Sequence, residues 1–285
     1  MNAIIGIRNA MLGAVCLTLS VNCFCLEVTP ASATISGLEL GENRDTGLEF
    51  TVKNDSEGAQ EFSLEAVLPD ITSGEAVKVY NNIPVLNWVY FDRPLLFIPA
   101  KSSDTSKVHV RVPSEDKYYN QHWAVACHVK QKGGSFVNAA DSPLLLIETK
   151  SKADVTENPY GEFGVAPGTV GIRLEDLKKK KTSFTVYNNG SKDCVFKIKG
   201  YIPDPKALGT KIALTKGFEW INERQWVKTS LEDLRLRAGE SKEVELEINL
   251  PGNLNIPATA AGLEALVLVE SEKNEYRFVR IVIVK

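Results

Sequence analysis

Histidine and cysteine are the residue types best suited to metal binding and nucleophilic chemistry, and the chain has three histidines and five cysteines. His122 and His128 are expected on one side of a single strand, about 20 Å apart at strand rise, which is too far to share a metal ion. His109 falls on the outward face of another strand. The sequence contains no Gly-x-Ser-x-Gly turn, His-Glu-x-x-His pair or phosphate-binding loop. It therefore predicts no enzyme, no cofactor and no metal site.

The cysteines give no disulfide framework. Cys16, Cys23 and Cys25 lie in the first 25 residues, which leaves two for the rest of the chain. Cys127 alternates in phase with apolar neighbours and is expected in a core. Cys194 starts a strand in the other half, so a bridge between the two would have to join different domains. Stability must then come from apolar cores.

The first 25 residues have the composition of a secretory signal peptide. Arg8 is their only charge, and "AMLGAVCLTLSVNCF" from Ala10 to Phe24 is apolar or small. This run is shorter than the roughly 20 residues that span a bilayer. We expect cleavage near residue 25, with an uncleaved anchor as the alternative. The mature protein would be exported to the periplasm, cell surface or exterior, with no membrane span.

The second half of the chain repeats the first. "FTVKN" at Phe50 returns as "FTVYN" at Phe184, 134 positions later. The second half then gains four residues, and at an offset of 138 Trp88 meets Trp226 and "VHVRVP" meets "LEINLP". We therefore expect two complete domains in tandem, 26–149 and 164–285, joined by a polar linker at 150–163.

Alternation of apolar and polar residues predicts strands throughout both halves. In "KVHVRVP" the valines Val108, Val110 and Val112 face one way, and "EVELEINLP" repeats the pattern. "HWAVACHV" and "LEALVLVE" are apolar on both faces, as in a central strand. We expect about seven short strands per half and an all-β fold of two tandem immunoglobulin-like antiparallel β-sandwiches.

These motifs resemble bacterial secreted immunoglobulin-like domains of the PapD-like and ASPM–SPD-2–hydin type. The resemblance rests on an "FTVxN" strand, a Trp strand and "FIPAKSS" leading into the alternating valines, over residues 47–129 and 182–269. It implies a binding or spacer module in the envelope or outside the cell, acting on another envelope or extracellular protein. Pilus chaperones also pair two such domains, which makes strand lending an alternative. "SPLLLIETK" would supply that strand as an edge at Leu144, Leu145, Leu146 and Ile147.

Three aromatic residues are the candidates for ligand contact. Trp220 and Tyr201 lie where the second half is longer than the first, and Tyr80 lies in the corresponding stretch of the first half. An accessory carbohydrate-binding module is therefore a further alternative. Trp88 and Trp226 occupy equivalent positions, which favours a packing role for both.

Charge differs between the halves. Residues 26–149 hold 10 Lys and Arg against 17 Asp and Glu, a net charge of −7, whereas residues 150–285 hold 22 against 19, a net charge of +3. Opposite charges favour docking of the domains or self-association. A pI near 5.8 argues against nucleic acid as a partner. We conclude that the sequence predicts a non-enzymatic exported module that mediates protein interaction or assembly.

Overall fold

The computed structural model describes residues 26–41, 44–69, 79–132, 142–152, 161–177, 182–202, 212, 214–215, 217–221, 223–252 and 254–285. The expected signal peptide and most of the expected linker lie outside these residues. The first half contains β1 (Leu26–Thr29), β2 (Ser32–Leu38), β3 (Arg44–Asn54), β4 (Gln60–Val67), β5 (Asn81–Asn82), β6 (Val89–Phe91), β7 (Leu95–Ile98), β8 (Ser102–Val110), β9 (His122–Gln131) and β10 (Leu144–Thr149), with 3-10 turns η1 (Leu86–Trp88) and η2 (Asp116–Tyr118).

The second half contains the same kinds of element. Its strands are β11 (Phe163–Ala166), β12 (Thr169–Arg173), β13 (Thr182–Asn188), β14 (Cys194–Tyr201), β15 (Phe218–Trp220), β16 (Val227–Thr229), β17 (Asp233–Leu236), β18 (Ser241–Ile248), β19 (Gly262–Ser271) and β20 (Tyr276–Val284), and its 3-10 turns are η4 (Leu174–Asp176) and η5 (Arg224–Trp226). Several strands are only two to four residues long, so the structure has more strands per half than the seven expected from sequence.

Strand order is the same in the two halves. The first half has one sheet in the order β1-β3-β8-β6 and another in the order β2-β10-β9-β4-β7, with β5 also pairing β9. The second half has β11-β13-β18-β16 and β12-β20-β19-β14-β17, with β15 also pairing β19. The chain changes sheets after β1 at Pro30 and after β11 at Pro167, both preceded by cis peptide bonds. The prediction of two tandem immunoglobulin-like β-sandwiches is confirmed.

Each sandwich has its own apolar core, built from the inward faces that the alternating pattern predicts. Val108, Val110 and Val112 are fully buried in the first core, together with Trp123 and Cys127. Both described cysteines, Cys127 and Cys194, are free and buried. Burial raises the pKa of the Cys127 thiol to about 12, so it packs as a small apolar group and has little thiolate character.

The Asn of the "FTVxN" motif joins the two sheets of each sandwich. The side chain of Asn54, at the end of β3, is 2% exposed, and its Nδ2 donates to the carbonyl oxygens of Gly58, Ile98 and Pro99 at 2.9–3.0 Å. Asn188 makes the equivalent three bonds in the second sandwich. One amide thereby satisfies backbone acceptors from a turn and from the opposite sheet, which explains why the motif recurs.

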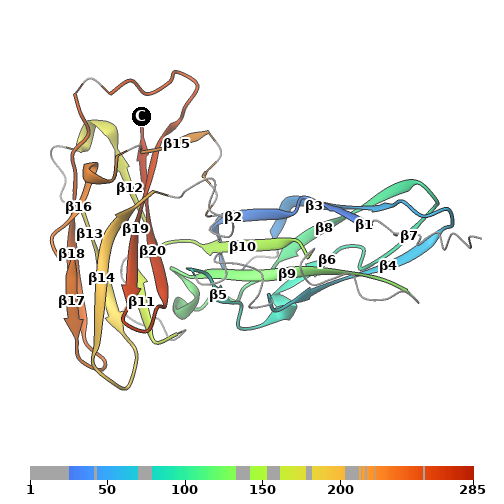
Figure 1. Cartoon of the computed structure of the whole chain (residues 1–285), viewed down its shortest axis with the longest axis horizontal. Helices are drawn as coiled ribbons and strands as arrows, with labels where there is room; N and C mark the ends of the chain where they lie inside the picture. The colour runs from blue at the N-terminus through green and yellow to red at the C-terminus, as the bar shows by residue number, and fades with distance from the viewer. Residues whose placement is uncertain are drawn as a thin grey trace, which may run out of the picture.

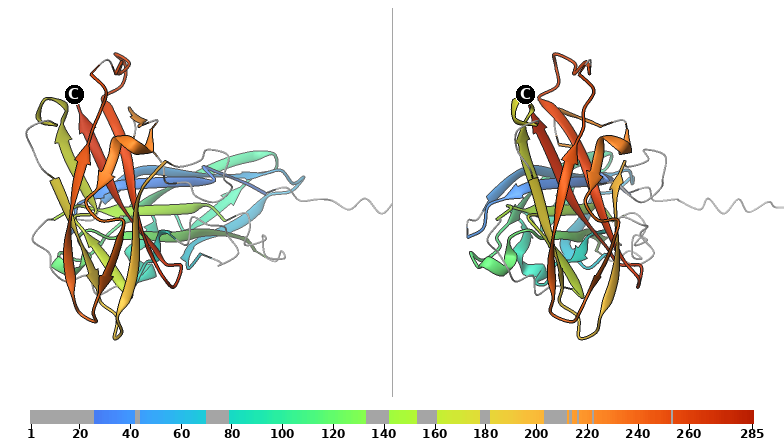
Figure 2. Two further views of the ribbon diagram at one scale, coloured as in Figure 1. Left: turned by 60° about the vertical axis from the view of Figure 1, so that its left-hand side comes forward. Right: turned by 90° about the vertical axis from the view of Figure 1, so that its left-hand side faces the viewer.

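The two sandwiches form an L-shaped molecule. Figure 1 shows the strands of the first sandwich running across the view and those of the second standing upright at its end. The turned views in Figure 2 show the same arrangement, with β9 and β10 of the first sandwich reaching the sheet that contains β19 and β20. The corner of the L is therefore a contact between two sheets.

Candidate functional site

The corner of the molecule is an apolar contact between the outward faces of these two sheets. Its buried members come from both domains: Val79, Tyr80, Ala124 and Leu146 from the first, and Ile212, Leu266, Leu268 and Phe278 from the second. We call this contact the junction. It explains why "HWAVACHV" and "LEALVLVE" are apolar on both faces, since one face of each strand lies in its own core and the other lies here.

A buried ionic group links the two domains at the junction. Arg280 on β20 donates from Nε and Nη2 to both carboxylate oxygens of Glu148 on β10, at 3.1 and 2.7 Å, and from Nη1 to Glu264 on β19 at 2.8 Å. The three side chains are at most 3% exposed. Ions this deep are stable only while paired, so Arg280 holds two carboxylates that burial would otherwise penalise.

The surroundings of Glu148 strengthen this pairing. Tyr80 donates its hydroxyl to Glu148 Oε1 at 2.7 Å, and Ser36 donates to Oε2 at 3.2 Å. Burial acts to raise the pKa of Glu148, but the charge of Arg280 and the hydrogen bonds from Arg280 and Tyr80 outweigh it, so the pKa is lowered. Burial, reinforced by the charge of Glu148, raises the pKa of Tyr80 well above its usual value. Glu148 therefore stays charged and Tyr80 stays neutral.

Aromatic stacking completes the junction. The His122 ring on β9 stacks on Phe278 of β20, with ring centroids 4.0 Å apart and planes within 3° of parallel. Tyr80 meets Phe278 edge-on at 5.5 Å. Burial lowers the pKa of His122 to about 4, although the charge of Glu148 acts in the opposite direction. A neutral imidazole thus packs as a flat apolar surface.

A second set of bonds fixes the chain where it passes between the domains. Asn120, which has a positive φ of 57°, accepts the backbone N–H groups of Lys152 and Gly168 on its Oδ1 at 3.0 and 3.1 Å. Thr169 donates its backbone N–H to Ser151 Oγ at 2.7 Å. These bonds tie the end of the first domain to the start of β12, beside the ionic group.

The aromatic residues proposed from sequence as ligand contacts gather at this junction. Tyr80 is buried, and Tyr201 and Trp220 are partly buried against the same cluster. Each therefore contributes to packing between the domains, which is not the exposed platform that carbohydrate stacking needs. Glu148, Glu264 and Arg280 were missed because a charge between apolar residues on a strand usually marks the wet face. Their one sequence signal was a charge within runs that are apolar on both faces.

The strand proposed for lending to a client is not an edge in the structure. Leu144 to Ile147 of β10 pair with β9 on one side and with β2 on the other. Leu145, Leu146 and Ile147 are also at most 1% exposed. The expectation of an edge here is wrong, because β2 crosses over from the first sheet and covers that side of β10. Lending these residues would require β2 to leave.

An exposed apolar edge lies at β7 instead. Leu95 and Phe97 point away from the core and are 61% and 69% exposed, whereas Leu96 and Ile98 between and after them are fully buried. β7 is the last strand of its sheet and, within the described part of the chain, pairs only with β4. The equivalent positions of β17 in the second sandwich are Asp233 and Arg235. The fold itself therefore does not require apolar residues there.

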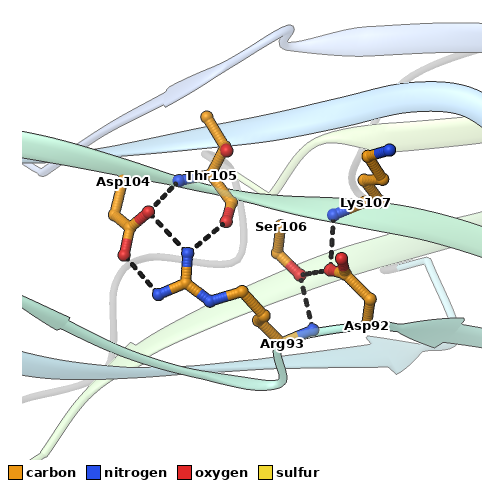
Figure 3. A network of polar contacts seen from close by, with 6 residues as sticks. All are labelled: Asp92, Arg93, Asp104, Thr105, Ser106 and Lys107. Atoms are coloured by element: carbon orange, nitrogen blue, oxygen red, sulfur yellow. Dashed lines mark hydrogen bonds and ion pairs between the residues drawn. The ribbon is translucent and has the colours of Figure 1, made fainter.

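The turn that leads into β7 is held by the polar network drawn in Figure 3. Asp92 Oδ1 accepts the backbone N–H of Lys107 at 2.7 Å and the Ser106 hydroxyl at 2.9 Å. The Arg93 guanidinium donates to both oxygens of Asp104, at 2.7 and 2.5 Å, and the bond from Arg93 lowers the pKa of Asp104. This two-point contact ties the turn between β6 and β7 to β8.

The described part of the chain includes no group of three or more His, Cys, Asp and Glu side chains that could hold a metal ion. They also include no helix with the length and apolar character needed to cross a membrane. His109 stacks on Tyr90, and His128 Nδ1 lies 3.8 Å from Glu65, in line with ordinary positions on a sheet.

Comparison with known proteins gives neighbours in fold. No family model matches the sequence, and no curated protein does. Solved structures include a protein of unknown function from Porphyromonas gingivalis W83 (10% identity, 91% of this chain and 99% of that one, TM-score 0.35) and the class 5 fimbriae chaperone CfaA (10%, 92% and 100%, 0.32). PapD-like domain 7 of human CEP192 also matches (9%, 52% and 96%, 0.31). The neighbours thus include a fimbriae chaperone and a PapD-like domain, and at these values they carry no argument on activity.

Proposed function

We propose that the protein is an exported, non-enzymatic module that binds another protein through the edge strand β7. The observation that carries this proposal is the exposure of Leu95 and Phe97 on a strand whose outer edge is open. An open edge offers backbone N–H and C=O groups to an incoming strand, and apolar side chains beside it add burial. Sheet edges that serve no contact usually carry charges, as β17 does with Asp233 and Arg235.

The contacts that hold the turn before β7 and the corner of the molecule support the same proposal. The Arg93–Asp104 contact holds the turn before the strand, and the ionic junction holds the first domain against the second. The surface around β7 would therefore be ordered before a partner binds, and little conformational entropy would be lost on binding. Export is the expectation drawn from the composition of residues 1–25, and it places the partner in the envelope or outside the cell.

The test compares variants of the tagged mature protein in affinity isolation from the native envelope fraction, with mass spectrometry of the recovered proteins. Leu95→Asp combined with Phe97→Arg gives β7 the charges of β17, and because both side chains are exposed we expect the fold to be unchanged. We expect a stoichiometric partner with the wild type that is lost with this double variant. Asp233→Ala with Arg235→Ala is the matched control on β17 and should retain the partner.

Recovery of the same partner with the charged β7 variant would overturn the assignment of the edge. As a control, the midpoint temperature of thermal unfolding should be the same for both variants as for the wild type, which shows that neither has lost its fold.

A further inference from the structure

A half-open cavity of about 390 Å³ lies at the end of the second sandwich that points away from the junction. Figure 1 places this end at the top of the upright domain, near the C-terminus and the η4 turn. Its walls are mostly apolar side chains that are partly exposed: Leu174, Leu177, Ile248, Leu250, Leu254 and Ile256. Small ligand pockets begin at roughly 300 Å³, so the space suits one compact group.

The equivalent end of the first sandwich is closed. Strand pairing fixes the correspondence, since Val89 pairs with Val110 in the first copy and Val227 pairs with Ile248 in the second. Val110 is fully buried, whereas Ile248 is partly exposed and lines the cavity. The two copies therefore differ in how this end of the core is covered.

Aromatic rings close the first copy. Tyr118, on the η2 turn, packs edge-on against Trp88 with ring centroids 4.8 Å apart, and against Trp123 at 6.2 Å. The second copy keeps Trp226 in the place of Trp88. β9 pairs with β4 in the same register as β19 pairs with β14, and this correspondence puts Leu263 in the place of Trp123.

The loop in the second copy also lacks its ring. Residues 251–261 read "PGNLNIPATAA" and contain no aromatic residue, whereas residues 113–121 contain Tyr118 and Tyr119. Two of the three rings that pack together in the first copy thus have no aromatic counterpart in the second.

We propose that this cavity binds an aromatic side chain of a protein partner. In the first copy a tyrosine ring on a short turn packs in the same core cluster as Val110 and Val112, whose counterparts Ile248 and Leu250 line the cavity, which is why we assign a side chain as the occupant. Aromatic anchors seated in a preformed apolar pocket are the usual centres of binding energy at interfaces. This site lies on the second domain and does not depend on the assignment of β7.

The test uses N-acetyltyrosinamide as the probe and methyl resonances of the full mature protein as the readout. We expect shifts confined to Leu250, Leu254, Ile256 and their neighbours, saturating in the millimolar range. Ile256→Tyr supplies a ring from the loop itself and should abolish the shifts. Ala258→Tyr, an exposed position in the same loop, should leave them unchanged.

Two results would overturn the proposal. One is the absence of shifts at the lining methyl groups in the wild-type protein, a measurement that needs no variant. The other is binding of p-cresol without binding of N-acetyltyrosinamide, which would show that a free small aromatic compound fits but that a side chain with its backbone does not.

Discussion

At the scale of single residues, the distinctive feature of this protein is charge held out of water between two domains. Burial acts to lower the pKa of Arg280, but Glu148 and Glu264 outweigh it and the pKa is raised. A buried ion pair contributes little net stability compared with apolar packing, but removal of one partner is costly. Removing one member of the ionic group should therefore destabilise the domain contact more than the intact group stabilises it.

His122 makes the junction sensitive to acid. Its pKa is about 4 in the folded protein against 6.5 in the unfolded chain, so the unfolded chain binds the proton first. Stability should then fall as the pH drops from about 6.5 to about 4, by roughly 3 kcal/mol for this group. Glu148 acts in the same direction at lower pH, because its lowered pKa means that stability is lost as the pH falls through that value.

The prediction is checked by measuring the free energy of unfolding in urea across this pH range. The variant is His122→Phe, in which the new side chain keeps a flat ring over Phe278. The variant should lose much of the pH dependence between 6.5 and 4. His109→Phe, on the outer face of the other sheet, should keep it. An unchanged slope in His122→Phe would show that the imidazole is not responsible.

At the scale of elements, the two copies show which parts of the pattern the fold requires. Both keep the "FTVxN" strand, the Trp turn and the alternating strand that follows. They differ at β7 and β17, where one carries Leu95 and Phe97 and the other carries charges. A feature that only one copy has is a candidate for a specific contact, whereas a feature that both have supports the sandwich.

The Asn of "FTVxN" belongs to the second kind, and Asn54→Asp tests it. Aspartate keeps the shape but loses the amide donors, so the carbonyl groups of Gly58, Ile98 and Pro99, of which the bond to Ile98 is buried, would face a carboxylate. We expect a loss of about 2–4 kcal/mol in the free energy of unfolding, measured in urea, and a similar loss for Asn188→Asp. Asn255→Asp, at an exposed loop position, should change it by less than about 0.5 kcal/mol. Wild-type stability in Asn54→Asp would contradict this role.

Prediction from sequence succeeded where the information was local. Alternation identified the strands and the core faces of Val108, Val110 and Val112, and the repeat identified two similar domains. It failed where the partner was distant, because Glu148 and Arg280 are 132 residues apart and meet only once both sandwiches have formed. The same limit explains the wrong prediction of an edge at β10. The strand that covers this side of β10 is β2, which lies more than 100 residues earlier in the sequence.

At the scale of the whole molecule, the junction should make the two sandwiches unfold together. Arg280→Met leaves Glu148 and Glu264 buried without a counter-charge and should weaken the domain contact by about 3–5 kcal/mol. Both cores are untouched, since Arg280 lies on the outer face of its sheet.

Differential scanning calorimetry reads this out directly. We expect one cooperative transition for the wild type and two separated transitions for Arg280→Met. Arg235→Met removes only an exposed ion pair with Asp193 and should behave as the wild type. A single transition at the wild-type temperature in Arg280→Met would show that the ionic group does not couple the domains.

The corner of the L also has a mechanical meaning. β7 lies towards the free tip of one arm (Figure 1), and the apolar cavity lined by Ile248 and Leu250 lies on the other arm, so two partners bound there would be held at a set separation and orientation. A rigid connection between two binding sites raises the effective concentration of each partner for the other, provided that the contact surfaces of the partners fit this separation and orientation. Loosening the corner would then weaken a three-component assembly while each pairwise affinity stayed the same.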